Sequence, residues 1–203
     1  MKIFVIFNGP PGAGKTTLLA PVFTAIIKTL YRQTGLRISA DSIAVPIKIF
    51  LSLSLGLPYQ EILKDATIYE SVIGDLTPRQ LLIKMSEEWI KPTCREDFFV
   101  QALLRRAFNC DIIVIDDCGF EVERQGLEEN PDHHVFLVHV YRKGCNFEND
   151  SRGYLNDPDH AFLNDGDGGA EDTAFERAIS NLLSDFAEFL EMHYETVPEV
   201  KLS

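Results

Sequence analysis

The stretch Gly9-Pro10-Pro11-Gly12-Ala13-Gly14-Lys15-Thr16 decides the fold class of this 203-residue chain. It matches G-x-x-x-x-G-K-[ST] at every fixed position, follows the strand-like run Ile3-Phe4-Val5-Ile6-Phe7, and leads into a helix-like run. A strand, a glycine-rich turn and a helix N-terminus together present backbone amides and a favourable dipole to a phosphate group. A glycine-rich turn without a ligand would not require this context. The stretch therefore predicts a loop that binds a nucleoside triphosphate.

The side chains and the backbone of this loop have different expected roles. Lys15 would reach the β- and γ-phosphates, and the hydroxyl of Thr16 would bind Mg²⁺. The glycines allow backbone conformations in which the amides turn toward an anion. The expected nucleotide-binding residues are Gly9, Pro10, Pro11, Gly12, Ala13, Gly14, Lys15, Thr16 and Thr17.

A second acidic feature follows an apolar run later in the chain. Asp116 and Asp117 come directly after Ile112-Ile113-Val114-Ile115, which reads as a buried strand. A carboxylate at such a strand end can hold Mg²⁺ directly or through water. The alternative is a pair of solvated turn residues, but the loop in the same chain favours the metal role for at least one of them.

Composition limits the kinds of partner. A formal net charge of −12 argues against a nucleic-acid polymer, whereas a small nucleotide in a locally basic site remains compatible with it. The four cysteines show no C-x-x-C or zinc spacing, which indicates reduced thiols and a cytoplasmic protein. We expect no signal peptide, because Met1 and Lys2 lead straight into the first strand, and no membrane span, because the apolar residues 43–57 are too few and interrupted.

Strand and helix signals alternate along the chain, which predicts an α/β fold. The sheet would be mostly parallel, with about five strands, helices on both faces and the ligand at the carboxyl ends of the strands. We expect one domain over residues 1–203, with Pro21 disturbing the first helix. The expected strands are 3–7, 36–40, 112–115, 135–140 and a short 161–163; the expected helices are 15–33, 46–55, 59–64, 77–89, 95–108, 121–127 and one from 173.

The polar residues 141–169 suggest what the nucleotide is used for. This span is rich in Gly, Asp and Asn, and the guanine-reading N-K-x-D motif of GTPases is absent from the chain. Phosphoryl transfer to a small acceptor requires that water be excluded, and a basic lid can do this. We therefore expect residues 141–169 to be a mobile lid in which Arg142 and Arg152 find partners only when phosphates bind. Each of these arginines has a solvated surface charge as its alternative.

Several short motifs, in order and spacing, extend this reading over nearly the whole chain. Together they resemble the deoxynucleoside monophosphate kinases of tailed bacteriophages. The motifs are Ala44-Val45-Pro46-Ile47-Lys48, Thr77-Pro78-Arg79-Gln80-Leu81-Leu82, Glu87-Glu88-Trp89, Glu96-Asp97-Phe98-Phe99-Val100, Asp117 with Phe120 and Glu123, Val140-Tyr141-Arg142-Lys143-Gly144, and Asn164-Asp165-Gly166.

The resemblance implies a P-loop kinase fold and transfer of the γ-phosphate of ATP to a nucleoside or deoxynucleoside monophosphate. Arg79 would then face the acceptor phosphate and Phe99 the base. Asp41 to Lys48 would begin the monophosphate-binding region. Asn164 and Asp165 would lie near the adenine of ATP, and Arg142 in the lid. A phage-encoded protein of this kind would act in the cytoplasm of its host, and the sequence leaves open whether it forms a homodimer.

Two positions depart from the family pattern. The family usually has an Arg two residues after the strand-ending Asp, where this chain has Gly119, and a lid His is replaced by Arg152. The first change removes a candidate phosphate contact, and the second can return a positive charge from another direction. Two alternatives therefore stay open: a P-loop kinase acting on another small or modified-nucleotide acceptor, and a nucleotide-binding regulatory protein that has lost transfer.

Overall fold

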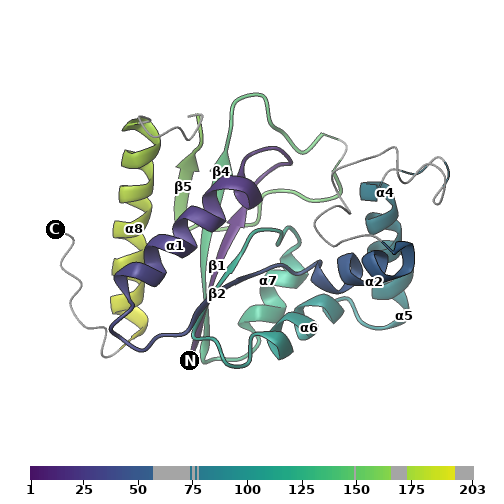
Figure 1. Cartoon of the computed structure of the whole chain (residues 1–203), viewed down its shortest axis with the longest axis horizontal. Helices are drawn as coiled ribbons and strands as arrows, with labels where there is room; N and C mark the ends of the chain where they lie inside the picture. The colour runs from purple at the N-terminus through teal and green to yellow at the C-terminus, as the bar shows by residue number, and fades with distance from the viewer. Residues whose placement is uncertain (57–73, 75, 77, 149, 166–172, 195–203) are drawn as a thin grey trace. The chain divides into compact units, whose positions relative to one another are not determined.

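A computed structural model of the protein describes residues 1–56, 74, 76, 78–148, 150–165 and 173–194 (Figure 1). The chain divides into two compact units. Met1–Ser42 and Arg106–Ser203 form the first, and Ile43–Arg105 forms the second. The first unit contains the complete sheet and the glycine-rich loop.

The first unit is built on a five-stranded sheet with the order β2-β3-β1-β4-β5. All four pairings are parallel, so every strand ends at the same edge. Central β1 aligns Ile3 with Ile112 on one side and with His134 on the other. The predicted mostly parallel sheet of about five strands is confirmed. The strands are β1 Lys2–Asn8, β2 Ile38–Asp41, β3 Ile112–Ile115, β4 His133–Tyr141 and β5 His160–Leu163.

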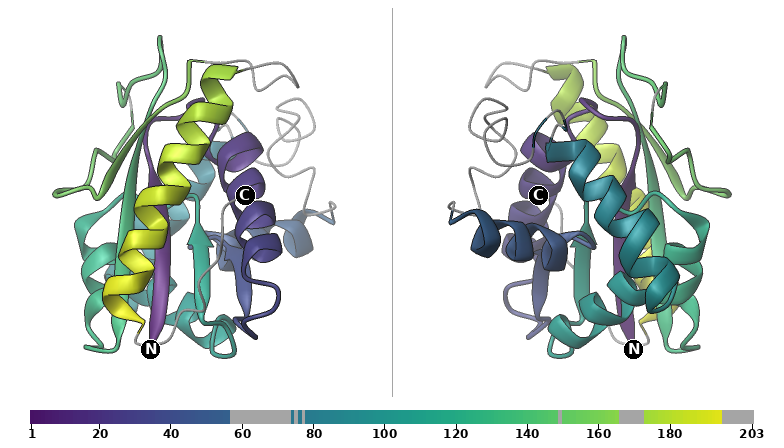
Figure 2. Two further views of the ribbon diagram at one scale, coloured as in Figure 1. Left: turned by 90° about the vertical axis from the view of Figure 1, so that its left-hand side faces the viewer. Right: turned by 90° about the vertical axis from the view of Figure 1, so that its right-hand side faces the viewer.

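Helices cover both faces of this sheet (Figure 2). On one face, α1 (Ala20–Leu30) and α8 (Thr173–His193) pack on the strands around Phe23 and Phe186, whose rings meet edge to face at 5.3 Å. On the other, α7 (Glu121–Glu128) packs on β4, with Leu127 fully buried. Burial of these aromatic and aliphatic side chains is the main stabilising contribution to the unit.

The helix after the glycine-rich loop begins irregularly, as the sequence predicts. A π-helical turn η1 (Lys15–Leu19) precedes α1, and Pro21 lies in the first turn of α1. Because η1 runs directly into α1, with the Ala20 N–H donating to the Lys15 carbonyl, Pro21 lies within a continuous helical path and cannot donate to the preceding turn. The loop is therefore joined to a helix whose first turn has its own geometry.

The second unit is helical. Its described elements are α2 (Val45–Leu55), α4 (Pro78–Ile83), η3 (Lys84–Ile90), α5 (Lys91–Thr93) and most of α6 (Phe98–Arg106). The continuous helix expected at 77–89 is divided into α4 and the π-helical η3, and α5 continues directly from η3. The helix expected at 59–64 and the capping residue Thr77 lie outside the described residues. Within the part of the chain that the structure describes, no helix has both the length and the apolarity to cross a membrane.

Candidate nucleotide-binding site

The glycine-rich loop leaves the carboxyl end of central β1 and packs against β4. A side chain at Gly9 would collide with the carbonyl oxygen of Val140, and its Cβ would also lie 3.1 Å from Val140 Cβ. Gly12 and Gly14 have φ values of +79° and +87°, which residues with a side chain rarely adopt. Three glycines of the motif are thus required by close packing or by backbone conformation.

Lys15 lies folded over its own loop. Its Nζ donates to the carbonyl oxygens of Gly9 at 2.6 Å and Pro10 at 2.7 Å, and the residue is only 9% exposed. Thr16 and Thr17, at the start of the π-helical turn, are exposed. The ammonium group is therefore held at the centre of the loop, where phosphate oxygens can replace the carbonyls as its acceptors.

Asn164 holds the loop from the end of β5. Its backbone N–H donates to the carbonyl of Tyr141 at 2.7 Å, and its Nδ2 donates to the carbonyl of Ala13, also at 2.7 Å. A Cβ at Gly14 would come within 2.5 Å of the same Nδ2. Asn164 is fully buried, yet its Oδ1 has no hydrogen-bond partner among the described residues. An acceptor at the loop thus remains available, while the neighbouring Asp165 is exposed.

The two acids that follow β3 lie at the same edge of the sheet as the loop. The hydroxyl of Ser42, just after β2, donates to Asp117 Oδ2, and Asp116 is half-buried. Because β3 is the direct neighbour of β1 and the two are parallel, Asp117, which follows β3, and the loop that follows β1 leave the sheet at the same edge. Within the described ranges, no group of three His, Cys, Asp or Glu side chains is placed to hold a metal ion. The donor set suits Mg²⁺, which uses one or two protein oxygens and completes its shell with phosphate and water.

Asp41, at the end of β2, is held within the protein. Arg106 donates from Nε and Nη2 to its two carboxylate oxygens, both at 3.1 Å, and also from Nη2 to the carbonyl of Ser42 at 2.9 Å. Asp41 Oδ1 accepts from the backbone N–H of Ser42 at 2.7 Å as well. These bonds fix the turn that carries Ser42 to Asp117.

The two arginines of the segment after β4 already have partners. Arg142 Nη1 donates to the carbonyl of Gly12 at 3.2 Å. Arg152 donates to both carboxylate oxygens of Asp150, at 3.1 and 2.9 Å. The expectation that these arginines find partners only when phosphates bind is therefore wrong. Arg152 is fixed by an acid two residues away, which a reading of composition does not reveal.

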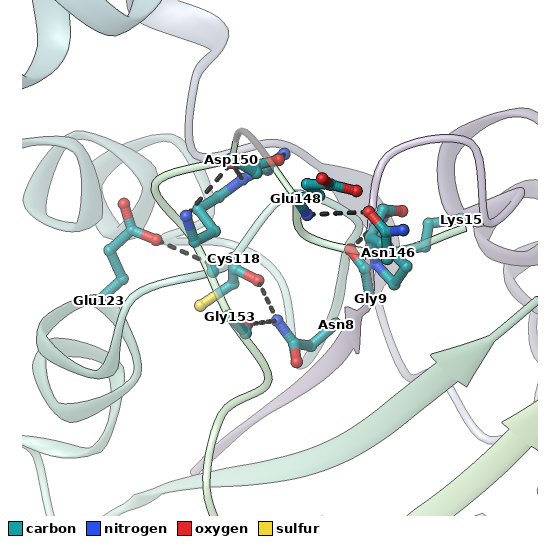
Figure 3. A network of polar contacts seen from close by, with 12 residues as sticks. Asn8, Gly9, Lys15, Cys118, Glu123, Asn146, Glu148, Asp150 and Gly153 are labelled. Carbon is teal, nitrogen blue, oxygen red and sulfur yellow. Dashed lines mark hydrogen bonds and ion pairs between the residues drawn. The ribbon is translucent and has the colours of Figure 1, made fainter. Parts of the chain in front are cut away.

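Asn8 is a residue of this site that sequence reasoning missed. It ends the apolar strand β1, immediately before Gly9, and is 1% exposed. Its Nδ2 donates to the carbonyls of Cys118 at 3.2 Å and Gly153 at 3.1 Å (Figure 3). Its Oδ1 accepts from the N–H of Leu155 at 3.1 Å. A polar residue at the end of an apolar run, directly before the loop motif, was the sequence signal that could have identified Asn8.

The remaining predicted site residues belong to the second unit. Phe99 is 3% exposed and meets Phe98 edge to face at 5.2 Å. Lys48 lies half-buried on α2, and Arg79 lies in the first turn of α4. Their roles toward an acceptor stay predictions.

His139 anchors the segment after β4 and titrates unusually. Its Nε2 lies 2.8 Å from the carbonyl of Leu155, which can only accept, so Nε2 carries the hydrogen and Nδ1 accepts from the hydroxyl of Tyr141 at 3.1 Å. Burial lowers the pKa of His139 from its ordinary value of 6.5, although the bond to Leu155 opposes the shift. Burial also lowers the pKa of His133 and His193. The neutral ring fits both hydrogen bonds.

We expect the melting temperature to fall as the pH is lowered from 7.5 to 5.5. The unfolded chain binds protons with the ordinary pKa, near 6.5, whereas folded His139, His133 and His193 bind them only at lower pH. The stabilising contribution of these histidines is therefore fully present above the pKa of the unfolded chain and is lost as the pH falls through the pKa values of the folded protein. Thermal melts of the wild type and of His139→Gln, which keeps a nitrogen donor but cannot be protonated, should show a shallower fall for the variant. Equal slopes would exclude a contribution from His139.

Comparisons with known proteins add little to this geometry. No family model matches the chain, and no curated protein does. The chain is similar in structure to APS kinase of Mycobacterium tuberculosis, solved with AMPPNP and APS, at 10% identity and a TM-score of 0.45 over 92% of this chain and 98% of that one. Thymidylate kinase of Ehrlichia chaffeensis matches at 16% identity and a TM-score of 0.29 over 94% and 83%.

Cobyrinic acid a,c-diamide synthase of Mycobacterium smegmatis, solved with an ATP analogue and magnesium, matches at 16% identity and a TM-score of 0.36, over 91% of this chain and 69% of that one. With TM-scores below 0.5, these likenesses do not bear on activity. The fold is established by the chain's own features: a parallel sheet in the order β2-β3-β1-β4-β5 with a G-x-x-x-x-G-K-T loop between β1 and a helix. This is a parallel α/β fold built around a P-loop.

Proposed function

We propose that the protein is an ATP- and Mg²⁺-dependent nucleotide kinase that transfers the γ-phosphate to a nucleoside or deoxynucleoside monophosphate. One observation carries the proposal. The phosphate-binding loop leaves the central strand β1, and the adjacent strand β3 ends at Asp116 and Asp117, at the same edge of a parallel sheet. A triphosphate on the loop would thus have carboxylates beside it, at the place where α/β sheets bind their ligands.

In this proposal the loop residues orient the donor nucleotide. The Nζ of Lys15 would exchange the carbonyls of Gly9 and Pro10 for β- and γ-phosphate oxygens. Thr16 and Asp117, with Asp116 as the alternative carboxylate, would hold Mg²⁺, which neutralises charge on the phosphate oxygens. The adenine of ATP would lie near Asn164, whose Oδ1 has no partner among the described residues, and near Asp165.

The arginines after β4 would act on the transferring phosphoryl group. Arg142 reaches the loop at Gly12 in the free protein, so a small rotation would bring its guanidinium to a bound phosphate. Positive charge that is in place before reaction stabilises the transition state without a cost of reorganisation. Arg152 is the second cation proposed for this role. On the acceptor side, the resemblance proposes Arg79 for the phosphate, Phe99 for the base, and the region from Asp41 to Lys48.

A coupled assay of ADP release across a panel of nucleoside and deoxynucleoside monophosphates tests the proposal. We expect Mg²⁺-dependent ADP release that one or a few monophosphates stimulate, and its loss in EDTA. Asp117→Asn should lower activity and raise the Mg²⁺ concentration needed for half-maximal rate, because an amide is a weaker ligand than a carboxylate. Binding of ATP without release of ADP for any acceptor would instead indicate a nucleotide-binding regulatory protein. ADP release that only another class of acceptor stimulates would identify a different kinase.

A further inference from the structure

A short segment of the chain is tied to the carboxyl-terminal parts of two strands, β1 and β4, and to helix α7. We call residues 150–156 the strap. Asn8, at the end of β1, bonds to the carbonyl of Gly153 and the N–H of Leu155. His139 on β4 bonds to the carbonyl of Leu155, which is 3% exposed.

Helix α7 holds the far end of the strap. The backbone N–H of Asn156 donates to Glu121 Oε1 at 2.6 Å, and Arg124 Nη1 donates to the carbonyl of Asn156 at 2.5 Å. With the bonds of Asn8 and His139, these contacts join the strap to β1, β4 and α7. Opening these hydrogen bonds costs substantial free energy, so the strap is an ordered element and not a flexible linker.

Gly119 leaves the space in which Arg152 lies. A Cβ built at Gly119 would come 2.8 Å from Arg152 Cγ and 3.0 Å from its Cβ, and would collide with its Cδ. Real side chains do not approach this closely, so a side chain at position 119 and Arg152 in its present place exclude each other. The stem of Arg152 fills the volume that a residue with a side chain would occupy after β3.

The guanidinium at the end of this stem is surrounded by acids. Asp150, whose side chain is 2% exposed, binds it at two points, and the Arg152 side chain is 19% exposed. Burial alone would lower the pKa of Arg152, but the hydrogen bond to Asp150 and the charges of Asp150, Asp117 and Glu123 outweigh it and raise the pKa above its ordinary value. The stem of Arg152 thus lies against Gly119, two residues after Asp117, the proposed Mg²⁺ ligand.

We infer that Asn8 and Gly119 are positioning residues, which together hold the strap so that Arg152 stands against Gly119, two residues after Asp117, before any ligand binds. The inference rests on the proposed function for its catalytic consequence, but its structural content is independent of it. Arg152 is a fixed cation of the site and not one that arrives with lid closure. The absence of a side chain at Gly119 makes room for Arg152.

A double-mutant cycle on Gly119 and Arg152 tests the steric half of the inference. Gly119→Ala should lower kcat by about tenfold while changing the KM for ATP by less than about twofold, because Arg152 is displaced and the loop is untouched. In an Arg152→Ala background, the same change should cost less than about twofold, since the Cγ and Cδ that the new methyl group meets are gone. Gln125→Ala is the control: it changes an exposed side chain of α7, leaves Gly119 and the strap untouched, and should behave as wild type.

Amide exchange tests the polar half without reference to activity. In the free protein the N–H of Leu155 should exchange slowly, because Asn8 Oδ1 accepts it in a buried place. Asn8→Asp keeps that acceptor but loses the donor to Cys118 and Gly153, so the whole strap should exchange faster and kcat should fall. Asn130→Asp is the control: its Oδ1 also accepts a backbone N–H, from Asp132 at 2.9 Å, but it is exposed and far from the strap along the chain.

The outcomes separate this inference from the proposed function. If the wild type releases no ADP with any acceptor, the kinase assignment fails, while exchange at Leu155 and coupling of the two substitutions in melting temperature still decide the inference. If the wild type is active but Gly119→Ala and Arg152→Ala have additive effects on both kcat and melting temperature, the inference is overturned and the kinase stands. Rapid exchange at Leu155 in the free wild type would overturn it equally.

Discussion

Replacing Lys15 by Ala is expected to lower turnover by about a hundredfold or more, the effect typical of deleting one preorganised transition-state contact. The reason lies in where its ammonium is held. Nζ rests between the carbonyls of Gly9 and Pro10 at the centre of the loop, in a residue only 9% exposed. A charge placed in so dry an environment interacts strongly with phosphate oxygens.

The measurement is the steady-state rate of ADP release, with ATP affinity followed separately by calorimetry. Lys28→Ala, at an exposed position of α1, removes a lysine without touching the loop and should keep the wild-type rate. Melting temperatures of both variants show whether the fold persists, because Lys15→Ala also leaves two loop carbonyls without their donor. A folded Lys15→Ala protein with near-normal turnover would contradict the kinase assignment.

The sheet and the loop could be predicted because their signals are local. Each strand is a short apolar run bounded by polar or glycine residues. The loop motif is recognisable because a strand-like run precedes it and a helix-like run follows it. Pro21 likewise predicts an irregular start of its helix, because the proline ring constrains the backbone of the turn that contains it. These features need no knowledge of which distant residues meet.

The contacts that organise the site could not be predicted, because each joins segments far apart in the chain. Asn8 and Gly153 are separated by 145 positions, and Asn164 and Ala13 by 151. Periodicity and propensity carry no information about such pairs without relatives to compare. The sequence could flag Gly119 as unusual, but only the packed structure shows that Arg152 fills its place.

The segment after β4 shows how composition can mislead. Its many polar residues predicted a chain without fixed partners, yet its few apolar and aromatic ones are well used. Leu155 is buried, and the Tyr154 ring lies against His139 and Tyr141 at centroid distances of 4.7 and 4.9 Å. Phe147 adds an edge contact to Tyr154 at 5.0 Å. These contacts give Tyr154 and Leu155 fixed partners that the polar composition does not reveal. Residues 149 and 166–169 of the predicted lid lie outside the described residues, and the mobility of the lid stays a prediction.

Replacing Gly9 by Ala should cost both stability and activity, for reasons that the loop motif alone does not give. The φ of Gly9 does not lie in the left-handed range, so an alanine there meets a steric obstacle and not a conformational one. Its methyl group would collide with the carbonyl oxygen of Val140, and a backbone atom of a paired strand residue cannot rotate away as a side chain can. Overpacking of this kind typically costs about 1–3 kcal/mol.

We expect a melting temperature several degrees below wild type, at roughly 2–4 °C for each kcal/mol in a chain of this size. Turnover should fall as well, because relief of the clash moves either the carbonyl of Gly9, which accepts from Lys15, or the end of β4 that leads to Arg142. Gly153→Ala, which adds the same methyl group where no described atom lies within 4 Å, should lower neither quantity. If Gly9→Ala melts and turns over like Gly153→Ala, the loop does not pack on β4 as closely as the structure shows, and close packing is not the reason why the motif begins with a glycine.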